Sequence, residues 1–158
     1  MFLNLFMIMS FSTILFCLNS NVAFADDFPQ IASFADNNTC SIKVGSDVID
    51  NFDCYGSRKP LLISYSYLYD SDVEFFVYIE QPLGNACDGG PLHVIINDNE
   101  AGYKPIGKID FCGGKYPTIS SGPSSFTIRI PQVDSAKDNK MGDVDIWSYR
   151  DKHLLKIN

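Results

Sequence analysis

Short apolar segments that alternate with period two, each bounded by turn residues, constrain the fold of this chain more than any other feature. Segments 61–69 and 73–80 both alternate in this way, and Asp70-Ser71-Asp72 between them is a turn signal. Comparable segments recur at 92–96, 103–111, 125–130, 143–150 and 153–157. No long segment has the apolar period of a helix. We therefore expect an all-β fold, a small antiparallel sandwich or barrel of about nine short strands.

The register of the hairpin formed by 61–69 and 73–80 predicts which side chains form the core. If Tyr69 pairs with Val73, one face carries only apolar and aromatic side chains, namely Ile63, Tyr65, Tyr67, Tyr69, Val73, Phe75, Val77 and Ile79. We expect this face to be core, since a slip of one residue would mix the two faces. The opposite face carries Phe76 and Tyr78 among serine and glutamate side chains. Either these two rings form a binding face, or another strand or the lead-in segment 26–39 covers them.

The N-terminus has the features of an export signal. Residues 5–17 form an uncharged, mainly apolar run that is shorter than the about 20 residues needed to cross a bilayer. Small residues in Val22-Ala23-Phe24-Ala25 predict cleavage after Ala25, with a signal peptide at 1–25 and a single β-rich exported domain at 26–158. A lipid anchor on Cys17 is the alternative, although the bulky Phe16 before it does not suit that processing. We expect a periplasmic or secreted protein without a stable membrane anchor after cleavage.

Four cysteines remain after the predicted cleavage, Cys40, Cys54, Cys87 and Cys112. An even number of cysteines in an exported chain predicts two disulfides, with three possible connectivities. Their spacings do not fit the closely spaced pairs of a zinc site. We therefore expect disulfides, and neither a metal nor another cofactor.

Hairpin turns favour one of these connectivities. The turn at 44–48 would bring Cys40 and Cys54 together across a hairpin. A second hairpin turns at 97–102, and if Ile96 faces Tyr103 in it, the same register places the other two cysteines opposite each other. The predicted bonds are thus both local, one in each hairpin.

The chain is acidic, with 12 Lys and Arg against 19 Asp and Glu and a formal net charge of −7. This charge opposes binding to nucleic acid or to an anionic membrane, since both attract cationic protein surfaces. A cationic protein partner is favoured instead. Two acidic loops could enter the basic cleft of such a partner: the turn with Asp98 and Glu100, and the segment 134–145.

No catalytic constellation is recognisable in the sequence. His93 lies within an apolar strand and His153 begins the last strand, so both are interpreted as ordinary strand residues. The chain has no Gly-x-Ser-x-Gly motif, and its cysteines are expected to be oxidised. The acidic turn at 97–102 lacks the ligands that a calcium loop requires at its later positions.

One short stretch, from Cys54-Tyr55-Gly56 through Leu62-Ile63-Ser64-Tyr65, resembles the opening strands of the periplasmic inhibitors of C-type lysozyme. That family consists of small disulfide-bonded β-barrels that block lysozyme with a Ser-Gly loop. Ser120-Ser121-Gly122 is the candidate for such a loop in this chain, and it lacks the flanking pattern. The resemblance therefore does not assign the chain to the family.

Together these features favour an exported, non-enzymatic binding module, inhibitor-like or immunity-like, that acts on a protein partner. The alternatives are a surface or fimbrial structural subunit, which would expose an edge strand or exchange strands, and a small secreted hydrolase. The candidate partner-binding residues are Phe76, Tyr78, Asp98 and Glu100.

Overall fold

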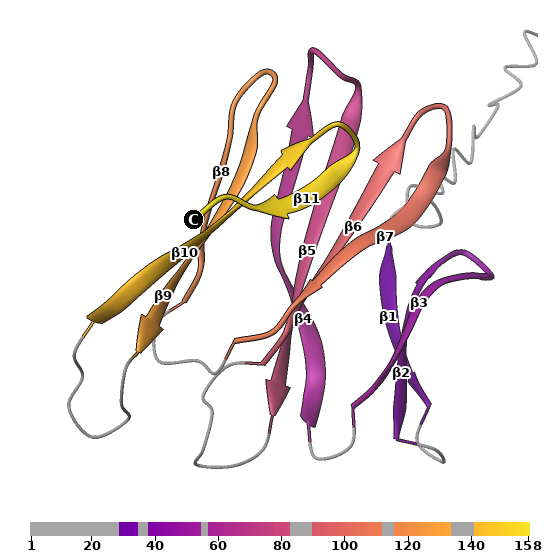
Figure 1. Ribbon diagram of the computed structural model, residues 1–158. Helices are drawn as coiled ribbons and strands as arrows, with labels where there is room; N and C mark the ends of the chain where they lie inside the picture. The colour runs from indigo at the N-terminus through magenta and orange to yellow at the C-terminus, as the bar shows by residue number, and fades with distance from the viewer. Residues whose placement is uncertain (1–28, 35–37, 55–56, 83–89, 112–115, 134–140) are drawn as a thin grey trace, which may run out of the picture.

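The computed structural model describes residues 29–34, 38–54, 57–82, 90–111, 116–133 and 141–158 (Figure 1). The predicted signal segment 1–25 lies outside the described residues, as do the alternative anchor Cys17 and the predicted pair Cys87 and Cys112. The described part of the chain is free of helices, and thus of any helix long and apolar enough to cross a membrane.

Within these residues, eleven strands form three antiparallel sheets. The first sheet has the order β1-β2-β3, with β1 (Gln30–Phe34), β2 (Thr39–Val44) and β3 (Asp47–Asp53). The second has the order β4-β5-β6-β7, with β4 (Ser57–Leu68), β5 (Val73–Pro82), β6 (Leu92–Asp98) and β7 (Gly102–Ile109). The third has the order β11-β10-β9-β8, with β8 (Thr118–Ser121), β9 (Phe126–Val133), β10 (Met141–Arg150) and β11 (His153–Lys156).

The all-β prediction is confirmed, and two of the strands are not anticipated by the sequence pattern. One is β1, which lies in the segment interpreted as a lead-in and pairs with β2 from Gln30 opposite Lys43 to Phe34 opposite Thr39. The other is β8, a short strand that pairs with β9. Both are edge strands whose extended conformation depends on the neighbouring strand, so their own sequences carry a weak signal.

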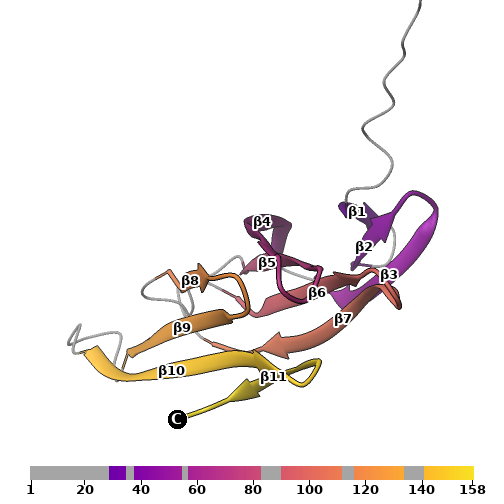
Figure 2. The same cartoon turned by 90° about the horizontal axis from the view of Figure 1, so that it is seen from above.

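The β4–β7 sheet is the middle of three layers. One of its faces packs against the β8–β11 sheet, through a core that includes Phe75, Val77, Val94, Phe126, Ile128 and Ile130. Its other face packs against the β1–β3 sheet, through a second core of Cys40, Ile42, Phe52, Phe76, Tyr78 and Ile95. Figure 2 shows β1–β3 and β8–β11 on opposite sides of the β4–β7 sheet. Burial on both faces explains why β5 and β6 are almost continuously apolar.

The β4–β5 hairpin is shifted by one residue from the predicted register. Leu68, rather than Tyr69, lies opposite Val73, because the turn takes four residues, 69–72, with Asp72 at a positive φ of 53°. The predicted core side chains on β5 are buried, whereas the predicted tyrosine face of β4 is wrong: Tyr65 is exposed, and Tyr69 is 76% exposed. Leu68 takes the place of Tyr69 in the core.

The other two predicted hairpins have the expected turns with different registers. In β6–β7, Ile96 lies opposite Lys104 rather than Tyr103, and Gly102 has a positive φ of 72° directly after the turn. The register used to place the second disulfide is therefore wrong. In β2–β3, the turn is formed by Gly45 and Ser46, with Gly45 at φ 56° as a two-residue hairpin turn favours.

Candidate functional site

Four hairpin turns meet at one end of the β4–β7 and β8–β11 sheets. The strands β4 to β11 run alternately up and down, so the turns β4–β5, β6–β7, β8–β9 and β10–β11 share one end of the molecule (Figure 1). The backbone N–H of Asp70 donates to the carbonyl of Pro123 at 3.0 Å, which ties the first turn to the third. Residues from all four turns line a hollow of about 530 Å³, here named the hairpin-tip hollow.

Charged side chains dominate the rim of the hairpin-tip hollow. Its lining includes four carboxylates and two cations: Asp72, Asp98, Glu100, Asp151, Arg150 and Lys152. Below them, the buried side chains of Leu68 and Val73, together with the half-buried Tyr149, form an apolar floor. The hollow is therefore acidic at its rim and apolar at its base, and its volume suits a side chain or a small ligand.

Asp98 is the most enclosed of these carboxylates, at 5% exposure. Its Oδ1 accepts a hydrogen bond from the backbone N–H of Glu100 at 3.1 Å. Its Oδ2 lies 3.3 Å from the Nζ of Lys152 and 3.9 Å from that of Lys104. The backbone hydrogen bond, opposed by burial and helped by Lys152, lowers the pKa of Asp98. Asp98 is thus held as an anion by its own turn.

Lys152 completes this arrangement from the solvent side. Its Nζ lies 3.5 Å from Glu100 Oε2 and 3.3 Å from Asp98 Oδ2, and these contacts, led by the one to Asp98, raise its pKa. The lysine side chain is 59% exposed and that of Glu100 is 86% exposed. Lys152 therefore contacts Asp98 and Glu100 from the surface and is not enclosed by them.

The structure separates the four predicted partner-binding residues into two groups. Asp98 and Glu100 lie together at the hairpin-tip hollow. Phe76 and Tyr78 are 1% and 2% exposed under the β1–β3 sheet, so the expectation that they form an exposed face is wrong. The hydroxyl of Tyr78 donates to the carbonyl of Pro29 at 2.6 Å, and burial raises its pKa to about 12. The alternative interpretation, cover by the lead-in segment and a further strand, is the one observed.

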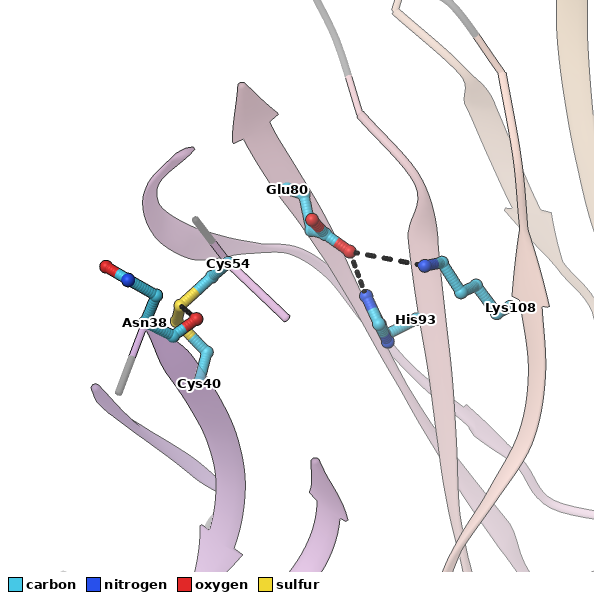
Figure 3. Close-up of a disulfide and its surroundings, with 6 residues drawn as sticks. All are labelled: Asn38, Cys40, Cys54, Glu80, His93 and Lys108. Carbon is cyan, nitrogen blue, oxygen red and sulfur yellow. Dashed lines mark hydrogen bonds and ion pairs between the residues drawn. A yellow bond between two sulfur atoms is a disulfide. The ribbon is translucent and has the colours of Figure 1, made fainter. Parts of the chain in front are cut away.

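The predicted Cys40–Cys54 disulfide is present, with Cα atoms 5.7 Å apart. It closes the open end of the β2–β3 hairpin, where the backbone N–H of Cys54 also donates to the carbonyl of Asn38 at 2.8 Å. Figure 3 shows Asn38 beside the bond, with the Cys54 Sγ 3.2 Å from its carbonyl oxygen. A disulfide sulfur carries no proton, so this last approach is a packing contact rather than a hydrogen bond.

A second charged cluster lies between the middle sheet and the β1–β3 sheet. His93 on β6 is 2% exposed, and its Nε2 lies 2.7 Å from Oε1 of Glu80 on β5. Its Nδ1 lies 3.1 Å from Oδ2 of Asp50 on β3. Lys108 on β7 approaches the same Glu80 oxygen at 3.8 Å (Figure 3). The ring of Phe52 stacks on the imidazole, with ring centroids 3.9 Å apart.

Sequence reasoning missed this cluster by treating His93 as an ordinary strand residue. A signal was present, since Glu80 and His93 both interrupt apolar strands, and alternation places them on the face opposite Val77 and Leu92. Asp50 gives no such signal because it comes from a different sheet. Only the packing of the two sheets brings its carboxylate to the imidazole.

The two carboxylates approach opposite nitrogens of the His93 ring, so they do not converge on a common point. In keeping with this, no three His, Cys, Asp or Glu side chains in the described ranges are grouped to hold a metal ion. Comparison of the sequence with protein-family models, with curated proteins and with solved structures finds no significant match.

Proposed function

We propose that this protein is an exported binding module, inhibitor-like or immunity-like, that receives a cationic side chain of a protein partner in the hairpin-tip hollow. The observation that carries the proposal is the anionic Asp98, almost enclosed at the rim and already in contact with an ammonium group. The export-like N-terminus, the acidic composition and the disulfide support a place in the periplasm or outside the cell.

The internal contact of Lys152 is a guide to what the hollow accepts. A lysine or arginine from a partner would meet the same two carboxylates, Asp98 and Glu100, after the largely exposed Lys152 side chain moves away. The apolar floor of Leu68, Val73 and Tyr149 would pack against the aliphatic stem of the incoming residue, as such stems do on apolar surfaces. Excess carboxylates at the rim would also accelerate encounter with a basic partner.

A titration with lysine and norleucine amides tests this proposal. N-acetyl-lysine methylamide should shift the backbone NMR signals of the β6–β7 and β10–β11 turns in a saturable way, with a Kd of about 1 mM or weaker for so small a ligand. N-acetyl-norleucine methylamide has the same stem without the charge and should not do so. Equal shifts from both amides, or shifts spread over the whole molecule, would contradict a cation site.

Two paired variants separate the site from general charge. Asp98→Asn with Glu100→Gln should abolish the lysine-specific shifts. Asp47→Asn with Asp110→Asn removes the same two charges at exposed positions outside the hollow and should preserve them. With a protein partner, the first pair should slow association and weaken its dependence on salt.

A second candidate function, a surface or fimbrial subunit, is favoured by the edge strand β4. This long strand ends the middle sheet and exposes Leu61, Leu62 and Tyr65. Exposed apolar edge strands accept a further strand from another chain. Light scattering tests this: association that grows with concentration and is lost in Leu62→Lys would support it, and a monomer at all concentrations would contradict it.

A further inference from the structure

His93 joins the middle sheet to the β1–β3 sheet within a largely apolar contact, where the Tyr78 hydroxyl also donates to the carbonyl of Pro29. Its partners come from both of them, Glu80 from the middle sheet and Asp50 from the β1–β3 sheet. The surrounding core side chains of the contact, such as Ile42 and Ile95, are apolar. The imidazole, together with these two carboxylates, is therefore a polar link across this interface, enclosed at 2% exposure.

The number of protons on the imidazole decides whether this link holds. A neutral imidazole has one N–H and one lone pair, so it can donate to only one of the two carboxylates. Its other nitrogen would direct a lone pair at a carboxylate oxygen about 3 Å away. The imidazolium donates to both. The observed geometry, with a carboxylate at each nitrogen, therefore fits the protonated ring.

The charges around His93 also favour a protonated imidazole. The charged or titratable groups that face it are Asp50 from β3, Glu80 and the cross-strand neighbour Tyr78 from β5, and Lys108 from β7. Strand β2 contributes Cys40 and Ile42 to this core, and neither carries a charge. With a protonated ring and a neutral tyrosine, two positive charges balance two carboxylates. Loss of the proton would leave an excess negative charge in an enclosed site, which is costly.

We propose that protonated His93 is a pH-dependent clasp that holds the disulfide-bonded β1–β3 sheet on the middle sheet and releases it as the ring loses its proton. Release would expose the second core, including Phe76 and Tyr78. The protein would then have a closed form in mildly acidic surroundings and a form with a loosened β1–β3 sheet at higher pH.

The sign of this effect follows from the proton equilibrium. Burial alone would lower the pKa of His93, but the hydrogen bonds to Asp50 and Glu80, together with the negative charges of these carboxylates, outweigh it and raise the pKa. A group whose pKa rises on folding stabilises the fold fully below its unfolded value, about 6.5 for histidine. That stabilisation is lost as the pH rises through the folded pKa. The clasp therefore weakens upward from about pH 6.5.

Two measurements on the oxidised protein test the clasp. The first is an NMR titration of the imidazole in His153→Gln, which leaves His93 as the only histidine; its pKa should lie above about 6.5. The second is amide hydrogen exchange of β2 and β3, corrected for the intrinsic pH dependence and referred to β9. Protection of β2 and β3 should fall with rising pH, by up to about tenfold for each unit by which folding raises the pKa of His93.

Asp50→Asn is the decisive variant, with Asp47→Asn as its control. An asparagine amide can turn either its NH2 or its oxygen toward the ring, so Asp50→Asn should accept neutral His93, lower its pKa and abolish the pH-dependent loss of protection. Asp47→Asn removes the same charge at an exposed position of the same strand and should behave as the unchanged protein. The clasp is refuted by a His93 pKa at or below about 6.5, or by the same pH dependence of exchange in all three proteins.

Discussion

Replacing Phe76 with alanine tests whether the β1–β3 sheet is packed on the middle sheet. The ring is 1% exposed, and its centroid lies 5.3 Å from that of Tyr65 and 5.9 Å from that of Tyr103. Removing a buried phenylalanine loses its transfer free energy, roughly 1.5–3 kcal/mol, and leaves a cavity between the sheets. We therefore expect Phe76→Ala to lower the free energy of unfolding by about 4 kcal/mol, within the 3–5 kcal/mol range of such substitutions.

Urea unfolding measures this loss. Trp147 is the single tryptophan, and its fluorescence reports on the core between the β4–β7 and β8–β11 sheets. Circular dichroism reports on the strands of all three sheets. Leu62→Ala is the control, since this side chain is exposed and its truncation should cost no more than about 0.5 kcal/mol. A loss below about 1 kcal/mol for Phe76→Ala, with an unchanged denaturant slope, would show that the ring is not enclosed and would refute the three-layer packing.

Three further outcomes are expected. Replacing both Cys40 and Cys54 with alanine should lower the free energy of unfolding by about 3 kcal/mol in urea unfolding, as loop-closure entropy predicts for a loop of this length. Since Cys40 and Cys54 are bonded to each other, peptide mapping without reduction should find the remaining cysteines of the predicted mature chain, Cys87 and Cys112, joined, and a peptide that joins either to Cys40 or Cys54 would contradict this pairing. Mass spectrometry of the exported protein should find Asp26 as the first residue, whereas an intact N-terminus would contradict the cleavage.

The β4–β5 hairpin shows how far sequence reasoning reached. Alternation predicted that Phe75, Val77 and Ile79 share a buried face, and they do. The tyrosines of the predicted β4 face were wrong because their placement depended on the length of the turn, whereas Ile63 of that face packs against the core at a β-bulge. A three-residue and a four-residue turn differ by one position, and that slip exchanges the two faces of the partner strand. Tyr69 is the extra turn residue, and Asp72 at positive φ closes the turn. The aspartates signal a turn without fixing its length.

In the candidate sites too, the sequence predicted features within single hairpins but not contacts between sheets. The acidic turn with Asp98 and Glu100 and the Cys40–Cys54 bond are local features of hairpins, and the sequence predicted both. The approach of Lys152 to Asp98 joins turns of two different sheets. The burial of Phe76 likewise depends on a layer formed by earlier strands. Such contacts depend on how sheets stack, which alternation within a strand does not encode.

The cation site of the hairpin-tip hollow and the His93 clasp lie at different positions along the strand pair β5–β6. Each can therefore be tested without disturbing the other. Val73 pairs with Asp98 at the hairpin-tip hollow, and Tyr78 pairs with His93 five residues further along β5 and β6. At about 3.3 Å per residue, the clasp lies roughly 17 Å from the hollow. The described lining of the hollow comes from the middle and β8–β11 sheets, whereas the clasp holds the β1–β3 sheet. Release of that sheet should therefore leave the cation site intact, so the lysine amide should bind with similar affinity at about pH 6 and about pH 9 if the cation site and the clasp are independent.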